Sequence, residues 1–345
     1  VLVADDPGPI SSQTEQDTRH FAKFANLPVF DPSTPEEAYE MMQDAFILSE
    51  KTNLPVFLRP TTRVCHACAV VDVAETNQEH QAEGFVRDSK WVIFPALSYR
   101  NHIKNEALQK EIAGWFDHSI YNAVQGNGTI GIAAGGISVT YAKEAIANLG
   151  LSKTVKFLKV GNPYPFPEGI AEYFLKGLEK VLVVEELDAF LEDELLRLCG
   201  KLHLPVQICG KNTGHMPVAG ENSLHAVQAA IAAFTGMELP ETELPALPAL
   251  PVRPPVLCAG CPHRGAFYAV KQAMKGKPVV FTGDIGCYTL GNAKPLEMVD
   301  TCLCMGAGIT VAQGMARAKN PAKHIAFIGD STFFHSGITG LVNAA

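Results

Sequence analysis

The sequence lacks the features that would assign it to a membrane, to a nucleic acid or to the cell exterior. No apolar run reaches the roughly 18 residues that a membrane-spanning helix needs, and no signal-peptide pattern opens the chain. Its 28 basic residues are outnumbered by 36 acidic ones, for a net charge of −8, which gives no electrostatic reason to expect nucleic acid. We therefore expect a cytoplasmic protein.

The cysteines do not follow the pattern of a disulfide framework. They are nine, an odd number, and they are scattered along 345 residues. In a reducing compartment, close cysteine pairs indicate metal or redox sites more readily than disulfides. The length also exceeds what one small core can use, and 47% hydrophobic residues is ordinary for packed α/β domains. We expect roughly two or three domains.

The alternation of apolar strands and amphipathic helices predicts an α/β protein of three doubly wound βα domains, with the first and third incomplete. We place the back half of one domain at 1–72, a linker region with helices at 73–127, and a second domain at 128–236. A proline-rich linker at 237–255 precedes the front part of a third domain at 256–345. The chain opens on a strand pattern and closes inside a helical one, so we expect neighbouring segments on both sides.

Individual elements are predicted within this scheme. The first domain contains a buried strand at 1–4 and a helix from Thr34, which Ser33 or Thr34 can cap. In the second domain four short strands alternate with three helices, which predicts a parallel sheet covered on both faces. Its strands are expected at 128–134, 154–161, 180–186 and 204–210, and its helices at 139–150, 169–178 and 189–202. In the third domain, strands at 278–284 and 324–330 enclose a helix at 305–318, and another helix starts near His335.

Two strands of the third domain end in the same way. The first presents Asp284 in Gly-Asp-Ile-Gly, and the second presents Asp330 in Gly-Asp-Ser-Thr. Between them, Gly306 and Gly308 open a helix, where backbone N–H groups and the helix dipole favour a phosphate. An acid beside a phosphate site holds a divalent cation through its oxygens. The pattern indicates a diphosphate bound through Mg²⁺.

Three cysteines surround the first of these turns. Cys258 and Cys261 have the spacing of metal ligands, and Cys287 follows Gly286. They can serve zinc or an iron–sulfur cluster, each of which needs a fourth ligand, or they can be buried thiols acting as small apolar groups. The residues alone leave these alternatives open.

The other acids and thiols are interpreted structurally. The pair Glu185 and Glu186 ends a central strand, where capping or interface roles are favoured over catalysis. The remaining cysteines are interpreted as structural or are left without a role: Cys65, Cys68, Cys199, Cys209, Cys302 and Cys304. In the first domain, Ser11, Ser12 and Gln13 occupy a loop after a strand end and are candidate substrate contacts.

Several longer motifs resemble those of one enzyme family. They are CAGCPHRG, GDIGCYTLG, MGAGITVAQGMA, GDSTFFHSGITGLVNA, ADDPGPISSQTEQDTR and LRPTTRV. Together they closely resemble the alpha subunit of the indolepyruvate:ferredoxin oxidoreductase family, which depends on thiamine diphosphate. The resemblance implies a pyrimidine-binding domain, a transketolase-C-terminal-like domain and a diphosphate-binding domain, in that order.

The resemblance also implies roles for individual residues. Asp330 is expected to bind Mg²⁺, and Ser331 takes the place of a glycine found in many thiamine enzymes. The cysteines Cys258, Cys261 and Cys287 match three ligands of a [4Fe-4S] cluster, whose fourth ligand would follow Ala345. A wider set of residues is expected around the cofactor: Asp284, Gly286, Gly306, Gly308, Gly329, Asp330, Ser331, His263 and Arg264. His263 and Arg264 are candidates to face the diphosphate or a substrate carboxylate. The glutamate that activates the cofactor would precede Val1, so no catalytic residue is assigned.

The implied activity is oxidative decarboxylation of arylpyruvates such as indolepyruvate to aryl-acetyl-CoA, with reduction of ferredoxin. Implied partners are coenzyme A, ferredoxin and a second (beta) subunit, in an oligomer. Two alternatives remain. One is a non-oxidative thiamine-diphosphate-dependent decarboxylase or synthase, which the absence of a cluster would favour. The other is a zinc-stapled binding subunit without catalytic activity, which would bind zinc but no thiamine diphosphate.

Overall fold

The computed structural model describes residues 1–6, 8, 14–73, 84–239, 251 and 254–345. The chain forms two compact units, Val1–Thr242 and Glu243–Ala345. Each unit combines helices with strands that are mostly parallel, so the predicted α/β class is confirmed. Because Ser11, Ser12 and Gln13 lie outside the described residues, the structure does not place these candidate substrate contacts.

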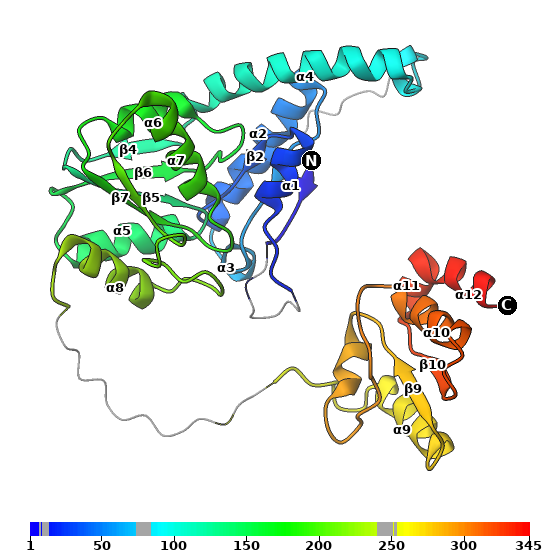
Figure 1. Cartoon of the computed structure of the whole chain (residues 1–345). Coiled ribbons are helices and arrows are strands. Elements are labelled where there is room, and N and C mark those ends of the chain that lie inside the picture. Colours follow the sequence, from blue (N-terminus) through cyan, green and yellow to red (C-terminus); the bar gives the residue numbers. More distant parts are fainter. Residues whose placement is uncertain (7, 9–13, 74–83, 240–250, 252–253) are drawn as a thin grey trace. The chain divides into compact units, whose positions relative to one another are not determined.

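The first unit begins with a three-stranded parallel sheet in the order β1-β3-β2 (Figure 1). The strands are β1 (Leu2–Val3), β2 (Val29–Phe30) and β3 (Phe57–Leu58), and the helices are α1 (Thr18–Ala25), α2 (Pro35–Thr52) and α3 (Thr62–His66). The start of α2 follows the prediction: the Thr34 side chain accepts from the N–H of Glu37, and Glu37 accepts from the N–H of Ser33. The prediction of a buried first strand is wrong, because β1 lies at the sheet edge and leaves Val3 60% exposed.

The segment between the first two sheets contains a short 3₁₀ turn (Ser89–Trp91), the long helix α4 (Pro95–Phe116) and the strand β4 (Ala123–Gln125). Helices were expected here, but β4 was not. It pairs antiparallel with β6 (Val155–Val160) at the edge of the second sheet. That sheet is therefore mixed: the four strands that were expected run parallel, as predicted, and β4 adds an antiparallel edge that was not predicted.

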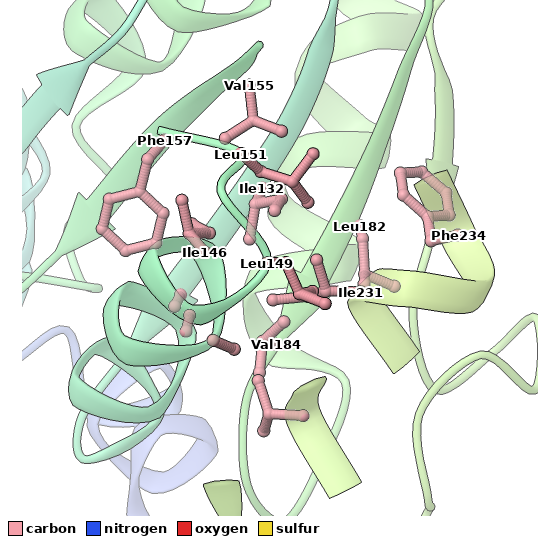
Figure 2. Packing of buried hydrophobic residues seen from close by; sticks show 14 of the residues in the cluster. Ile132, Ile146, Leu149, Leu151, Val155, Phe157, Leu182, Val184, Ile231 and Phe234 are labelled. Carbon is pink, nitrogen blue, oxygen red and sulfur yellow. The ribbon is translucent and has the colours of Figure 1, made fainter. Parts of the chain in front are cut away.

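The five-stranded sheet runs in the order β4-β6-β5-β7-β8, and its further strands are β5 (Ile130–Gly135), β7 (Lys180–Val184) and β8 (Gln207–Cys209). Helices α5 (Ser138–Asn148) and α8 (Leu224–Thr235) pack on one face, and α6 (Glu168–Leu175) and α7 (Phe190–Leu202) pack on the other. Side chains along β5 alternate between these two cores, because Ile132 belongs to the first and Ala133 to the second. Figure 2 shows the first core, to which Ile132, Leu182 and Ile231 belong. This sheet is doubly wound, as predicted.

The second unit contains two parallel strands, β9 (Val279–Thr282) and β10 (Lys323–Ala326). Its helices are α9 (Pro262–Met274), α10 (Ala307–Arg317), α11 (Asp330–Thr332) and α12 (Ile338–Ala344), and a 3₁₀ segment covers Cys287–Asn292. The helix expected near His335 begins earlier, at Asp330, and passes through one π-helical turn at Phe333–Gly337 before α12. Phe267, Phe281 and Phe327 form the centre of this unit's core.

Within the described residues, none of the helices has the length and apolar character that crossing a membrane requires.

Candidate functional site

The two Gly-Asp turns of the second unit lie side by side. Strands β9 and β10 are parallel neighbours with Thr282 opposite Ala326, so both turns follow at the same edge of the pair. Asp284 is 1% exposed. Its Oδ1 accepts the N–H of Gly306 at 2.8 Å, and its Oδ2 accepts the N–H of Gly329 at 3.2 Å. One buried carboxylate therefore joins the first turn to the start of α10 and to the second turn.

Close packing, against backbone at Gly308 and against a side chain at Gly306, explains the glycines that open α10. A Cβ at Gly308 would lie 2.7 Å from the carbonyl oxygen of Gly283, and one at Gly306 would lie 2.5 Å from Oγ of Ser336. Gly306 also has φ 87°, a left-handed conformation that favours glycine. The hydroxyl of Thr282 donates to the carbonyl of Gly308 at 2.8 Å. These contacts bring the N-terminal end of α10 against the turn that carries Asp284.

Asp330 differs from Asp284 although both follow a glycine at a strand end. Asp330 and Ser331 are exposed, and among the described residues the carboxylate of Asp330 has no hydrogen-bond partner. A free carboxylate beside a helix N-terminus is a donor set that suits Mg²⁺ and a diphosphate, since Mg²⁺ prefers carboxylate and phosphate oxygens. The residues therefore fit the predicted group, with Asp284 organising the turns and Asp330 available as a ligand.

Gly286 begins the segment that carries the third cysteine. It is exposed, with φ 126°, and its carbonyl accepts the N–H of Thr289 at 3.0 Å. The Thr289 hydroxyl donates to the carbonyl of Asp284 at 2.8 Å. The turn and the 3₁₀ segment that starts at Cys287 are thus fixed to each other, while a direct contact of Gly286 with a cofactor stays a prediction.

The cysteines predicted as cluster ligands come from neighbouring elements. All nine cysteines are free thiols, with Cys258 and Cys287 exposed and Cys261 half-buried. Cys261 precedes α9, and its N–H bonds to the carbonyl of Cys258 at 3.3 Å. The ring of His263, in the first turn of α9, lies 4.4 Å from the ring of Tyr288, the residue after Cys287. This contact holds the Cys-x-x-Cys loop beside the segment that carries Cys287.

His263 and Arg264 contact the cysteine loop. Nδ1 of His263 lies 3.1 Å from Sγ of Cys261. The guanidinium of Arg264 donates to the carbonyl of Cys258 at 3.0 Å and also to that of Leu257. A contact of either side chain with a diphosphate or a substrate carboxylate stays a prediction.

Among the described residues, one group of three possible ligand atoms lies within 4.8 Å: Asp17, His20 and Asp188. Nη2 of Arg19 already contacts the Asp17 carboxylate at 2.5 Å. Burial opposes ionisation of Asp17, but the charges of Arg19 and Arg59 outweigh it and hold the pKa well below its usual value. The guanidinium of Arg19 thus lies where a metal cation would bind Asp17, and we interpret this carboxylate as part of an ion pair. Cys258, Cys261 and Cys287 form no group within that distance, and their role as cluster ligands stays a prediction.

A seam of buried charges in the first unit was not predicted. Arg59, which follows β3, donates to Asp6 at 2.5 Å and to Asp31 at 3.1 Å. Arg19 donates to Glu185, which follows β7 in the other sheet, at 2.7 Å. Burial is the main cause that raises the pKa of Asp31, to about 6. The sequence signal was a charged residue directly after three strands, Asp31 after β2, Arg59 after β3 and Glu185 after β7, which is easily interpreted as a solvated turn.

Of the paired acids, Glu185 has a helix-capping role, which was favoured from the sequence. Glu185 accepts the N–H groups of Leu191 and Glu192, at 2.9 and 3.0 Å, in the first turn of α7. Glu186 accepts the N–H of Asn222 at 2.9 Å. Burial raises the pKa of both carboxyl groups. Each acid satisfies backbone donors that would otherwise be buried without a partner.

Two of the other cysteines agree with the structural interpretation. Cys199 and Cys209 are buried in the cores of the second sheet, and burial raises the pKa of each thiol. Cys65 and Cys68 are exposed. The pKa of the Cys65 thiol is raised, mainly by partial burial of the sulfur and to a smaller extent by the negative charge of Asp5. None of these four belongs to a group of three possible ligands within the part of the chain that the structure describes.

Comparison with known proteins adds a sequence relationship. Residues 284–345 match the family described as thiamine pyrophosphate enzyme, C-terminal TPP binding domain. The matched region begins at Asp284 and includes α10 and the Gly329-Asp330 turn. The geometry described above and the matched family therefore fall on the same part of the chain.

Relatives in three archaea cover the whole chain. The protein named indolepyruvate oxidoreductase subunit IorA in Methanothermobacter thermautotrophicus is 43% identical and aligns with 100% of this chain and 56% of its own length. Its namesakes in Pyrococcus horikoshii and Archaeoglobus fulgidus are 39% and 41% identical, aligning with 100% of this chain and with 57% and 56% of their own lengths. The resemblance found in the motifs is confirmed, and the chain spans about half the length of the curated relatives it matches.

A solved structure of 2-oxoglutarate:ferredoxin oxidoreductase from Magnetococcus marinus is a more distant match. It covers 67% of this chain and 48% of its own, with 14% sequence identity and a TM-score of 0.44. At this level of similarity it supports no inference about residues.

Proposed function

We propose that this chain, a relative of the indolepyruvate oxidoreductase IorA subunits over its whole length, forms the diphosphate-binding part of a thiamine-diphosphate-dependent arylpyruvate:ferredoxin oxidoreductase. The observation that carries the proposal is the junction at Asp284, whose two carboxylate oxygens fix the N-terminal end of α10 and the Gly329-Asp330 turn beside each other. The sequence relationship to the IorA subunits supports the same reaction class.

Different residues of the junction are proposed to bind Mg²⁺ and the diphosphate. Asp330, exposed and without a partner among the described residues, is the proposed side-chain ligand of Mg²⁺. The first turn of α10, which includes Gly308, is the proposed contact of the diphosphate, with the helix dipole favouring its negative charge. When bound, thiamine diphosphate supplies the nucleophilic carbon and the electron sink that decarboxylation of a 2-oxoacid requires. The buried carboxylate of Asp284 fixes the first turn of α10 and the turn that carries Asp330 beside each other.

The three cysteines are the proposed path for electrons. Cys258, Cys261 and Cys287 are free thiols on adjacent elements, and a [4Fe-4S] cluster held by them would need a fourth ligand. We propose that the substrate is an arylpyruvate, with coenzyme A taking the acyl group and ferredoxin the electrons. A second (beta) subunit completes the enzyme in the cytoplasm.

The domain division belongs to the same proposal. Residues 1–72 would form part of the pyrimidine-binding domain, 73–127 a linker region and 128–236 the transketolase-C-terminal-like domain. The Pro-rich linker at 237–255 would join these to the diphosphate-binding part at 256–345. The charged seam gives the first two domains a built contact, since Arg19 joins α1 to Glu185 across it.

The Mg²⁺ assignment is tested with Asp330→Ala in the full-length protein together with its partner subunit. We expect thiamine diphosphate to bind roughly 100-fold more weakly, by analogy with the loss of metal affinity when a metal site is damaged. Isothermal titration with Mg²⁺ present measures this, and Asp72→Ala, which changes an exposed aspartate of the first unit, is the control. Unchanged affinity in the Asp330 variant would rule out the assignment.

The cluster assignment is tested with Cys287→Ser, with Cys304→Ser as the control, since both thiols are exposed in the same unit. We expect the iron content of the anaerobically purified full-length protein to fall in the first variant and to stay unchanged in the second. Equal iron content in wild type and Cys287→Ser would return the thiols to a structural role. Indolepyruvate-dependent reduction of ferredoxin, measured with coenzyme A, tests the reaction as a whole.

A further inference from the structure

Cys261, a proposed cluster ligand, lies close to the imidazole of His263. Among the described residues of the second unit, it is the one proposed ligand whose sulfur contacts a histidine ring. Nδ1 of His263 lies 3.1 Å from Sγ of Cys261, within hydrogen-bonding distance of a sulfur. Both side chains are half-buried. Cys261 directly precedes α9 and His263 lies in its first turn, so the thiol also lies at the positive end of a helix.

The imidazole is held in place by aromatic packing. The ring of Tyr288 meets it edge to face, at 4.4 Å and 66°. Tyr288 in turn contacts the fully buried ring of Phe267 at 5.4 Å and stacks on Phe327 at 5.8 Å and 23°. Because Tyr288 itself packs against the core, its ring supports the orientation of Nδ1 toward the sulfur.

The chemistry of an iron ligand then decides which atom donates. A cysteine that binds iron is a thiolate and offers only acceptor sites, so the proton must lie on Nδ1 of His263. Hydrogen bonds to the sulfurs of a cluster stabilise its more negative, reduced form and thereby set its reduction potential. The positive end of α9 acts in the same direction.

We infer that His263 donates a hydrogen bond to the Cys261 thiolate and raises the reduction potential of the cluster bound there, as a positioning residue for electron transfer. This inference rests on the proposed function, since it needs a cluster at Cys258, Cys261 and Cys287. It assigns His263 to the electron path, where the sequence had placed it toward the diphosphate or a substrate carboxylate.

The experiment is a redox titration of the full-length protein, purified without oxygen together with its partner subunit and followed by electron paramagnetic resonance. The signal of this cluster is identified as the one that Cys287→Ser removes. His263→Phe keeps a ring against Tyr288 but has no donor, and we expect its midpoint potential to be more negative than that of wild type. His225→Phe, an exposed histidine of α8 in the first unit, is the matched control and leaves the potential unchanged.

Two polar variants keep the test decisive if His263→Phe loses iron. His263→Asn places an amide N–H near the position of Nδ1, whereas His263→Gln places it near Nε2. We expect the asparagine variant to keep a potential close to wild type and the glutamine variant to have a lower one. Equal potentials in these two variants, or an unchanged potential in His263→Phe, overturn the inference.

Failure of the proposed function gives a different result. In that case the wild-type protein shows no iron signal that depends on Cys287, and no bound thiamine diphosphate. A cluster that is present, depends on Cys287 and ignores residue 263 leaves the proposed function intact and removes only the role of His263.

Discussion

Replacing Gly308 by alanine tests whether the start of α10 must lie against the Gly283-Asp284 turn. A Cβ at Gly308 would lie 2.7 Å from the carbonyl oxygen of Gly283, a backbone atom that cannot turn away. Gly314 lies in the same helix and has nothing within 4 Å of its Cβ position. Both substitutions therefore add a methyl group to the same helix, but only the one at Gly308 collides with a neighbouring backbone atom.

The magnitude follows from two opposing effects. Alanine is favoured over glycine inside a helix by about 0.8–1 kcal/mol, so Gly314→Ala should stabilise the second unit by roughly that amount. Forcing a methyl group into a packed contact costs about 1–3 kcal/mol. Gly308→Ala should thus be less stable than Gly314→Ala by about 1–3 kcal/mol. The displaced helix should also lengthen the bond from Gly306 to Asp284 and weaken thiamine diphosphate binding.

Native-state hydrogen exchange measures this within the second unit. Both tryptophans, Trp91 and Trp115, lie in the first unit, so their fluorescence does not report on the site. The amide of Phe327, which bonds to the carbonyl of Thr282 at 2.8 Å, is a suitable probe of the strand pair. Equal protection of this amide and equal cofactor affinity in the two variants would show that α10 does not need the close approach.

Two further predictions concern the first unit. Phe174→Ala removes a fully buried ring from the core under α6 and α7, and we expect a loss of about 3–5 kcal/mol in the free energy of unfolding, measured by urea titration of tryptophan fluorescence. The lowered pKa of Asp17 means that its contribution to stability is present above its unfolded value of 3.8 and is lost as the pH falls below it. Asp17→Asn should accordingly lower stability at pH 7 and reduce the loss on acidification; a variant with the wild-type acid profile would contradict the ion pair.

The regular elements were predictable because their signals are local. The strands and helices between β5 and β8 follow alternating apolar runs whose ends differ from the predictions by a few residues. Strand β4 was not predicted because it has only three residues, Ala123–Gln125. It lies at an antiparallel edge of the sheet, where partial burial leaves little alternation of apolar and polar residues. Helix α8 was also missed, although Ser223 caps it through a hydrogen bond to the N–H of Ala226.

The two Gly-Asp turns of the candidate site could be recognised from the sequence, but the different surroundings of their two acids could not. The sequence shows Asp284 and Asp330 in equivalent Gly-Asp positions. Only the fold buries the first between two backbone N–H groups and leaves the second exposed. Likewise, the pairing of Cys261 with His263 depends on the ring of Tyr288, which the sequence places 25 residues away. Long-range contacts of this kind leave no periodic signal.

The seam of buried charges has a consequence for how the chain folds as it is synthesised. The bond from Arg19 to Glu185 joins residues 166 positions apart. Until Glu185 has left the ribosome, Arg19 has the carboxylate of Asp17 but lacks this second one, so burying Arg19 early would compensate less of the cost of removing its charge from water. We therefore expect the charged edge of the first sheet to stay hydrated while more than a hundred residues are added. We expect the seam to close late, after the strand that precedes Glu185 in the second sheet has been synthesised.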